Sequence, residues 1–240
     1  MPVQAQIRPG ILLAAALIGC WLASAAPRLP AAEPAPAAIL ESLRMTAFAS
    51  RATLDGRIRH QGESTPVRIG IAPGRADYTF PGSDERIALR LADGGARLLR
   101  NGEPVRGDAR LFSIAGSDLA LGDLAFEFLY WSDAERLDDE KIMGLPTRQI
   151  RVKAPSRDAL YAAVDIHVAR QSGALLQIRC YNWDGQLVKR FKVVQGQRVD
   201  GRWMLRQMRI ESYPPGSRRA ASRSYLEIEQ VESPATAPAG

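Results

Sequence analysis

The chain has 240 residues, of which 46% are hydrophobic and 24% are charged. These fractions are ordinary for a globular protein, so they exclude a wholly disordered chain and a polytopic membrane protein. The formal net charge is +6, and 28 of the 32 basic residues are arginine. Two cysteines and two histidines leave little material for a metal site.

The first 25 residues predict a secretory signal peptide. Arg8 precedes an apolar stretch from Ile11 to Leu22, and small residues follow it up to Ala26. This order is typical of an export signal cleaved after Ala25, and the stretch is shorter than the about 20 residues of a membrane span. An uncleaved N-terminal anchor is one alternative. We therefore expect an exported, periplasmic protein.

Cys20 offers a second alternative for the N-terminus. It ends the sequence Leu-Ile-Gly-Cys, which resembles a bacterial lipobox, although apolar residues continue after the cysteine. Lipidation of Cys20 would make the chain a membrane-anchored lipoprotein. If Cys20 instead leaves with the signal, the mature chain keeps only Cys180 and has no intramolecular disulfide.

Composition divides the rest of the chain into three parts. Residues 26–37 are rich in proline and alanine and predict an extended tether. Residues 38–231 form one domain, and residues 232–240 form a flexible tail. A chain of this length buries about 70% of the surface that its unfolded state exposes.

Hydrophobic periodicity predicts the elements of the domain. Residues 38–50 have the apolar spacing of a helix, and residues 121–129 predict a second, aromatic helix capped by Ser117 or Asp118. Alternating runs predict strands at 54–60, 66–72, 75–80, 86–91, 96–100 and 110–114 before the second helix, and at 147–153, 161–170, 174–181, 187–195, 203–212 and 225–231 after it.

Asp-Gly and Asn-Gly turns join many of these strands, which indicates antiparallel hairpins. The predicted class is α+β, with one strongly curved antiparallel half-barrel sheet of about ten strands that encloses two or three helices. So large a sheet curls, because it cannot stay open and flat. An interior curled around few helices can remain partly empty and form a ligand cavity.

The inward faces of the strands and the aromatic helix are the candidate lining of that cavity, and a fully packed core is the alternative for each residue. The candidate lipid-binding residues are Ile58, Ile69, Ile71, Leu89, Leu91, Leu124, Phe128, Trp131, Val164, Ile166, Leu176, Ile178, Phe191, Met204, Met208 and Ile210.

We expect no catalytic residue, metal or cofactor. Asp165 and His167 share a strand face opposite the apolar stripe, so we expect them to face solvent. The strand order separates His60 from that pair. Cys180 alternates with apolar residues and is expected to be a buried, inert thiol. Residues 138–140, Asp-Asp-Glu, predict a solvated loop.

Arginines are dispersed along the chain, which argues against a nucleic-acid partner. The one dense cluster, Arg218, Arg219 and Arg223, is a candidate contact with anionic lipid headgroups or an acidic partner. A solubilising face is the alternative.

Several ordered motifs resemble those of LolA-like outer-membrane lipoprotein-sorting proteins. The motifs are residues 116–119 (GSDL), 122–131 (GDLAFEFLYW), 181–191 (YNWDGQLVKRF), 208–211 (MRIE) and 225–229 (YLEIE). The resemblance covers most of residues 40–231. Relatives within this superfamily include LolB-like and RseB-like proteins.

The resemblance implies an incomplete antiparallel barrel covered by helices, and a non-enzymatic carrier that shelters acyl chains of lipoproteins or lipids. It also implies an inner-membrane transporter as donor and an outer-membrane receptor as acceptor, with a monomeric carrier between them. In such carriers an arginine holds the lid closed, and Arg75 lies near that position but out of register. An envelope sensor or protein-interaction module without lipid cargo is the alternative function.

Overall fold

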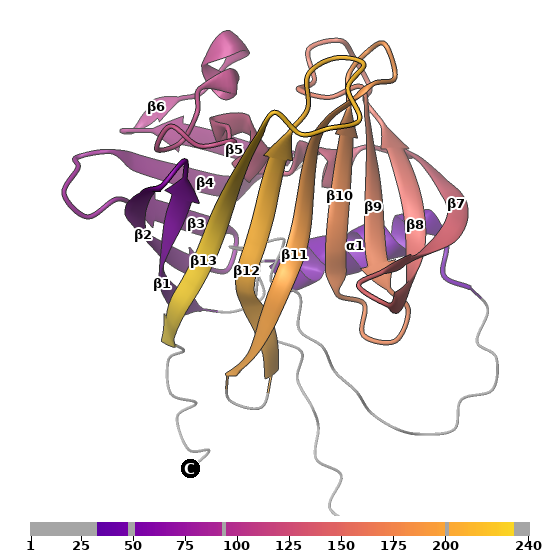
Figure 1. Ribbon diagram of the computed structural model, residues 1–240, viewed down its shortest axis with the longest axis horizontal. Helices are drawn as coiled ribbons and strands as arrows, with labels where there is room; N and C mark the ends of the chain where they lie inside the picture. Colours follow the sequence, from indigo (N-terminus) through magenta and orange to yellow (C-terminus); the bar gives the residue numbers. More distant parts are fainter. Residues whose placement is uncertain (1–32, 48–50, 93–94, 200–201, 233–240) are drawn as a thin grey trace, which may run out of the picture.

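The computed structural model describes residues 33–47, 51–92, 95–199 and 202–232. Within these residues thirteen strands form a single antiparallel sheet (Figure 1). The first six strands are β1 (Ala52–His60), β2 (Glu63–Ala72), β3 (Arg75–Thr79), β4 (Arg86–Ala92), β5 (Gly95–Arg100) and β6 (Glu103–Pro104). The others are β7 (Asp133–Ile142), β8 (Leu145–Lys153), β9 (Ala163–Ala169), β10 (Leu175–Tyr181), β11 (Leu187–Val199), β12 (Arg202–Ser212) and β13 (Ser222–Glu232).

The sheet consists of two meanders joined by one long-range strand pair. Strands β1 to β6 form one wing and β7 to β13 form the other, and β1 pairs with β13 to connect them. The outer edges are β6, which is two residues long and contains Pro104, and β7, which is rich in charged residues. Short and charged edges resist pairing with other chains, which suits a sheet that stays open.

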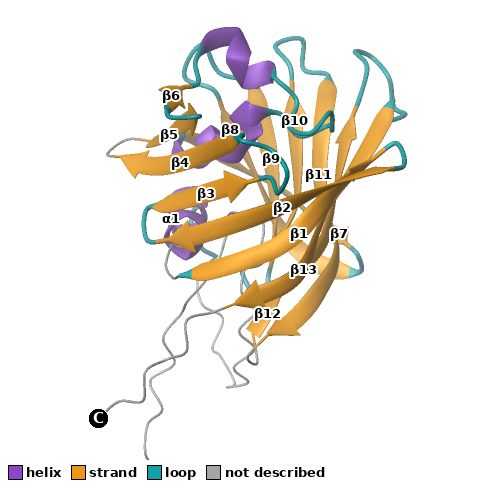
Figure 2. Cartoon of the chain, turned by 90° about the vertical axis from the view of Figure 1, so that its left-hand side faces the viewer, coloured by secondary structure: helices purple, strands orange, loops and turns teal. Residues whose placement is uncertain are grey.

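The chain must cross from one edge of the open sheet to the other between β6 and β7. It crosses on the concave side and carries three 3₁₀ helices, η1 (Gly107–Leu111), η2 (Leu121–Ala125) and η3 (Glu127–Tyr130) (Figure 2). The α-helix α1 (Pro36–Ala47) covers another part of the concave side and contacts η3 and β7. Sheet and covers enclose the apolar core.

Several predicted elements differ from the structure. The sheet has thirteen strands among the described residues, where about ten were expected. Residues 110–114 are not a strand, because η1 occupies their start and Ser113 makes an isolated bridge to Ala120. Residues 138–140 lie within β7 and not in a loop, since a charged edge strand lacks the alternation that sequence patterns detect.

The prediction of a single aromatic helix at residues 121–129 is also wrong. Residues 121–130 form η2 and η3, which are separated by Phe126 in the left-handed region at φ 44° and ψ 41°. A bulky residue in this region is strained by about 1–3 kcal/mol, so tertiary contacts must hold it there. Ser117 and Asp118 do not cap η2, whose N-cap is Ala120.

The described residues begin at Glu33 and end at Glu232. They therefore exclude the predicted signal peptide with Cys20, most of the tether and nearly all of the tail. The predicted helix at 38–50 is observed as α1, two residues earlier at its start, and residues 48–50 are likewise outside the description.

Candidate functional site

The concave face of the sheet is the candidate site. Fourteen of the sixteen predicted lining residues belong to one buried apolar cluster. Leu91 is half-buried and lies outside that cluster. Leu176 joins a satellite cluster with Ile142 and Ala174, because a bulge in β10 turns Leu175 inward in its place.

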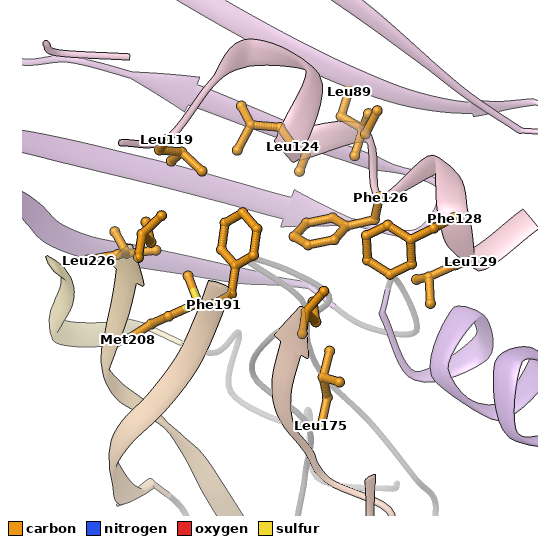
Figure 3. Close-up of a cluster of buried hydrophobic side chains, with 14 of the residues drawn as sticks. Leu89, Leu119, Leu124, Phe126, Phe128, Leu129, Leu175, Phe191, Met208 and Leu226 are labelled. Atoms are coloured by element: carbon orange, nitrogen blue, oxygen red, sulfur yellow. The ribbon is translucent and has the colours of Figure 1, made fainter. Parts of the chain in front are cut away.

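Aromatic side chains fill the middle of this interior (Figure 3). Phe126 and Phe128 meet edge to face at 5.8 Å between ring centroids, and Trp131 meets Phe128 in the same manner at 6.5 Å. A gap of about 20 Å³ remains beside Phe80 and Phe126, and one of about 10 Å³ remains beside Trp131. Each gap is about the size of one water molecule, so the interior is filled at these two places.

Residues 114–131, here called the upper cover, are fixed by a buried ion pair. Asp123 accepts hydrogen bonds from Lys189 Nζ at 2.7 Å, from the Tyr161 hydroxyl at 2.5 Å and from the backbone N–H of Ala120 at 2.8 Å. Asp123 is 4% exposed. Removing one partner of such a pair is costly, because the remaining charge stays buried. The upper cover is therefore firmly attached to β11.

A second polar cluster ties the upper cover to β1 and β13. The Asp118 carboxylate accepts hydrogen bonds from the hydroxyls of Ser222 and Ser224, and Ser224 also contacts His60 Nδ1 at 2.8 Å. Ser224 is fully buried and its hydroxyl is directed at Asp118, so it is not placed as a nucleophile activated by His60. The cluster works as a structural clasp.

The α1 cover is attached less firmly. It buries Ile39, Leu40 and Leu43 against the interior, and Arg44 lies 5.6 Å from the centroid of the Tyr130 ring. Its other large apolar side chain with described exposure, Met45, is 71% exposed. The two covers therefore differ in kind. Buried charged hydrogen bonds hold the upper cover, whereas α1 is held by three apolar side chains and, just before its start, by partly exposed ion pairs of Glu33 with three arginines.

An apolar groove of about 140 Å³ opens on the lower rim, which we define as the end of the sheet with the β7–β8 turn, the β9–β10 turn and the projecting ends of β11 and β12 (bottom of Figure 1). Several lining residues belong to the interior cluster or pack on it, so groove and interior share walls. The lining residues are Met143, Leu145, Ala174, Leu175, Leu176, Val193, Gly196, Trp203, Met204 and Leu205.

On the convex face of β8, β9 and β10, the expectation that Asp165 and His167 face solvent is wrong. Asp165 and His167 were expected in solvent, yet they are 1% and 0% exposed. Arg151 binds Asp165 at 2.6 Å, and Glu140 on β7 contacts His167 Nε2 at 3.1 Å. Long side chains on neighbouring strands cover these positions, which alternation along one strand cannot reveal.

The remaining candidates for reactive or metal-binding side chains form no site. Cys180 is fully buried, and burial raises the pKa of its thiol well above the ordinary value. Across the described ranges, no group of three His, Cys, Asp or Glu side chains could hold a metal ion. None of the helices within the described part of the chain is long and apolar enough to cross a membrane.

The arginines singled out in the sequence lie apart from the interior. Arg218 and Arg219 are exposed in the loop between β12 and β13, and Arg223 binds the buried carboxylate of Glu211 at 3.0 Å. Arg75 is half-exposed, and its guanidinium lies 3.8 Å from Asp77. A membrane or partner contact at 218, 219 and 223 stays a prediction.

Sequence reasoning missed the polar attachments of the upper cover. A signal for one was present, because Lys189 is two residues before Phe191 and so shares its inward strand face. A charge on an apolar strand face requires a buried partner. The partner, Asp123, belongs to η2, 66 residues away in the chain, which a strand pattern does not indicate.

The architecture is similar to that of three solved structures. An outer membrane lipoprotein-sorting protein domain from Vibrio parahaemolyticus matches with a TM-score of 0.68 at 11% identity, over 84% of this chain and 93% of that one. A LolA superfamily protein from Nitrosomonas europaea matches at 0.62 and 13%, over 84% and 94%. A DUF1329 family protein from Desulfovibrio piger matches at 0.61 and 13%, over 84% and 92%. The chain shares the fold of these three structures.

Residues 102–236 match a protein family whose description is "uncharacterized protein", and the chain belongs to that family. A comparison with curated proteins gives no match.

Proposed function

We propose that the protein is a non-enzymatic envelope carrier that shelters the acyl chains of a lipoprotein or lipid between the concave sheet face and the α1 cover. The single observation that carries this proposal is the contrast between the two covers. A large apolar interior is closed on one side by a firmly bound segment and on the other by a helix with three buried apolar side chains. The α1 cover is the element that can open.

The free energies of burial favour the replacement of α1 by an acyl chain. Burial of Ile39, Leu40 and Leu43 contributes roughly 6 kcal/mol in total, and the conformational entropy of ordering the helix offsets much of this. An acyl chain gains about 0.8 kcal/mol per buried CH₂, so fourteen methylenes contribute about 11 kcal/mol. A chain can therefore displace the helix from the interior.

The likeness to a lipoprotein-sorting domain and to a LolA superfamily protein supports the carrier proposal at the level of the fold. By this analogy the carrier acts in the periplasm, takes cargo from an inner-membrane transporter and delivers it to an outer-membrane receptor. The exposed arginines at 218 and 219 are candidate contacts for such a partner or membrane.

Stopped-flow uptake of a fluorescent fatty acid tests the proposal. Leu43→Ala weakens the closed state, so the uptake rate should rise about tenfold, because the open state becomes more populated. Met45→Ala changes an exposed residue of the same helix and should leave the rate unchanged. If the wild type and both variants take up no probe, the carrier proposal is contradicted.

The filled parts of the interior beside Phe80, Phe126 and Trp131 favour a second function, an envelope sensor or protein-interaction module on the same scaffold. This alternative predicts no uptake in the same experiment. It also predicts that Leu43→Ala changes only the free energy of unfolding.

A further inference from the structure

Three arginines on the lower rim converge on one carboxylate. Glu33, which precedes α1, lies 2.7 Å from Arg136 of β7, 2.9 Å from Arg148 of β8 and 2.9 Å from Arg170, which follows β9. Asp139 contacts Arg136 at 2.7 Å and Arg170 at 2.5 Å. We call Arg136, Arg148 and Arg170 the arginine clamp.

The arginine clamp is built as an anion site. Arg148 is held in place by a further hydrogen bond to the backbone carbonyl of Arg170 at 3.0 Å. Hydrogen bonds from Arg136 and Arg148 lower the pKa of Glu33 to about 2, so Glu33 is ionised at neutral pH. Without Glu33, three positive charges face the single negative charge of Asp139. Guanidinium groups match phosphate as well as carboxylate geometry.

The clamp and the apolar groove of the lower rim are separated by a single strand, β9. Val168 of β9 pairs with Arg148 of the clamp on one side and with the groove residue Leu175 on the other. Arg170 and the groove residue Ala174 flank the same short turn. The N–H of Arg170 also donates to the carbonyl of Pro146, next to Leu145, at 3.0 Å. A charged site and an apolar groove side by side fit the two ends of one amphiphile.

We infer that the lower rim binds a phosphate-bearing lipid, whose phosphate takes the place of the Glu33 carboxylate in the arginine clamp and whose acyl chain lies in the groove. The Glu33 carboxylate thus occupies the position that the lipid phosphate takes when the lipid binds. Its displacement releases the segment that leads into α1, so that headgroup binding and opening of the α1 cover are coupled. This inference rests on the proposed function and names its substrate class.

Equilibrium titration with three probes tests the inference. The probes are dodecyl phosphate, dodecyl maltoside, which has the same chain with a neutral head, and inorganic phosphate, all below micelle-forming concentrations. The readout is the ratio of the two amphiphile affinities, because any loosening of α1 affects both amphiphiles alike and cancels. For the wild type we expect dodecyl phosphate to bind about tenfold more tightly than dodecyl maltoside, and inorganic phosphate to bind far more weakly than either.

Variants of the clamp give the sharper test. Arg148→Gln and Arg170→Gln should each bring the ratio close to one, whereas Glu33→Gln should raise it, because the internal competitor is gone. Arg97→Gln removes an exposed arginine of β5, in the other wing of the sheet, and should leave the ratio unchanged. Met143→Gln, at an exposed groove residue, should weaken both amphiphiles equally. Thermal melts are the control that establishes whether each variant is folded.

The outcomes separate this inference from the proposed function. Equal binding of both amphiphiles by the wild type overturns the inference and leaves the carrier proposal standing. Binding of inorganic phosphate as tight as that of dodecyl phosphate overturns the lipid assignment and identifies a site for free anions. Absence of binding of either amphiphile contradicts the carrier proposal together with the inference.

Discussion

At the scale of single residues, buried charges link neighbouring strands of the sheet. Glu211 is fully buried on β12 and lies 2.5 Å from Arg190, 3.2 Å from Arg209 and 3.0 Å from Arg223. Burial raises the pKa of Glu211, but the hydrogen bond and charge of Arg190 outweigh burial and hold this pKa below the usual value. The carboxylate therefore joins three neighbouring strands.

Glu211→Gln should lower the free energy of unfolding at pH 7 by roughly 3 kcal/mol, because three guanidinium groups lose their shared partner. Arg223→Gln is the matched control, since this arginine is 59% exposed and its loss should cost less than about 1 kcal/mol. Urea unfolding measures both values. Equal losses in the two variants would contradict the structural role given to Glu211.

His167 predicts a specific dependence of stability on pH. Burial, and then the charge of Arg179, lower the pKa of His167 in the folded state. Since unfolded histidine titrates near its ordinary pKa of about 6.5, acidification protonates the unfolded state first. The free energy of unfolding should therefore fall between pH 7 and pH 5.5.

His167→Gln, which keeps a donor toward Glu140, should flatten this part of the curve of unfolding free energy against pH. Denaturant titrations at several pH values provide the measurement. A variant curve as steep as that of the wild type would show that another group is responsible.

At the scale of elements, the strand pair between β1 and β13 joins the two wings of the sheet. The register shifts at Asp55 and Gly56, where the backbones approach closely. A Cβ atom at Gly56 would lie 2.0 Å from the carbonyl oxygen of Glu227, which no side chain can accommodate without a shift of backbone.

Gly56→Ala should therefore destabilise the fold by about 3 kcal/mol, because the shift disrupts the one pairing between the wings. Gly70→Ala on β2 is the control, since a Cβ atom there would lie 4.0 Å from the carbonyl oxygen of Asp77, and its effect should stay within about 1 kcal/mol. Thermal unfolding of both proteins compares them. Similar melting temperatures would contradict this account of the bulge.

The elements also show where sequence patterns succeed. Most central strands alternate between apolar and polar residues, because one face of each lies on the core, and their positions were predictable. The edge strand β7 was not, since its charged residues show no alternation. The upper cover was misread as one helix because its apolar spacing is helical, while its left-handed Phe126 depends on contacts from distant strands.

At the scale of the whole molecule, the curved sheet and its concave apolar face followed from the hairpin pattern and the resemblance to LolA-like proteins. Fourteen of the proposed lining residues share one interior cluster, which a filled core would show equally, so their role in lipid binding stays a prediction. The arginine clamp and the rim groove could not be predicted, because they join residues from separate strands and turns that only the folded sheet brings together.

The central claim is that the closed interior exchanges its α1 cover for an acyl chain. Native mass spectrometry of the protein purified from the envelope without detergent tests it most directly. We predict a population whose mass exceeds that of the mature chain by one or more lipid molecules, and which loses this excess on mild activation. A bare chain alone, both as purified and after incubation with envelope lipids, would contradict the claim.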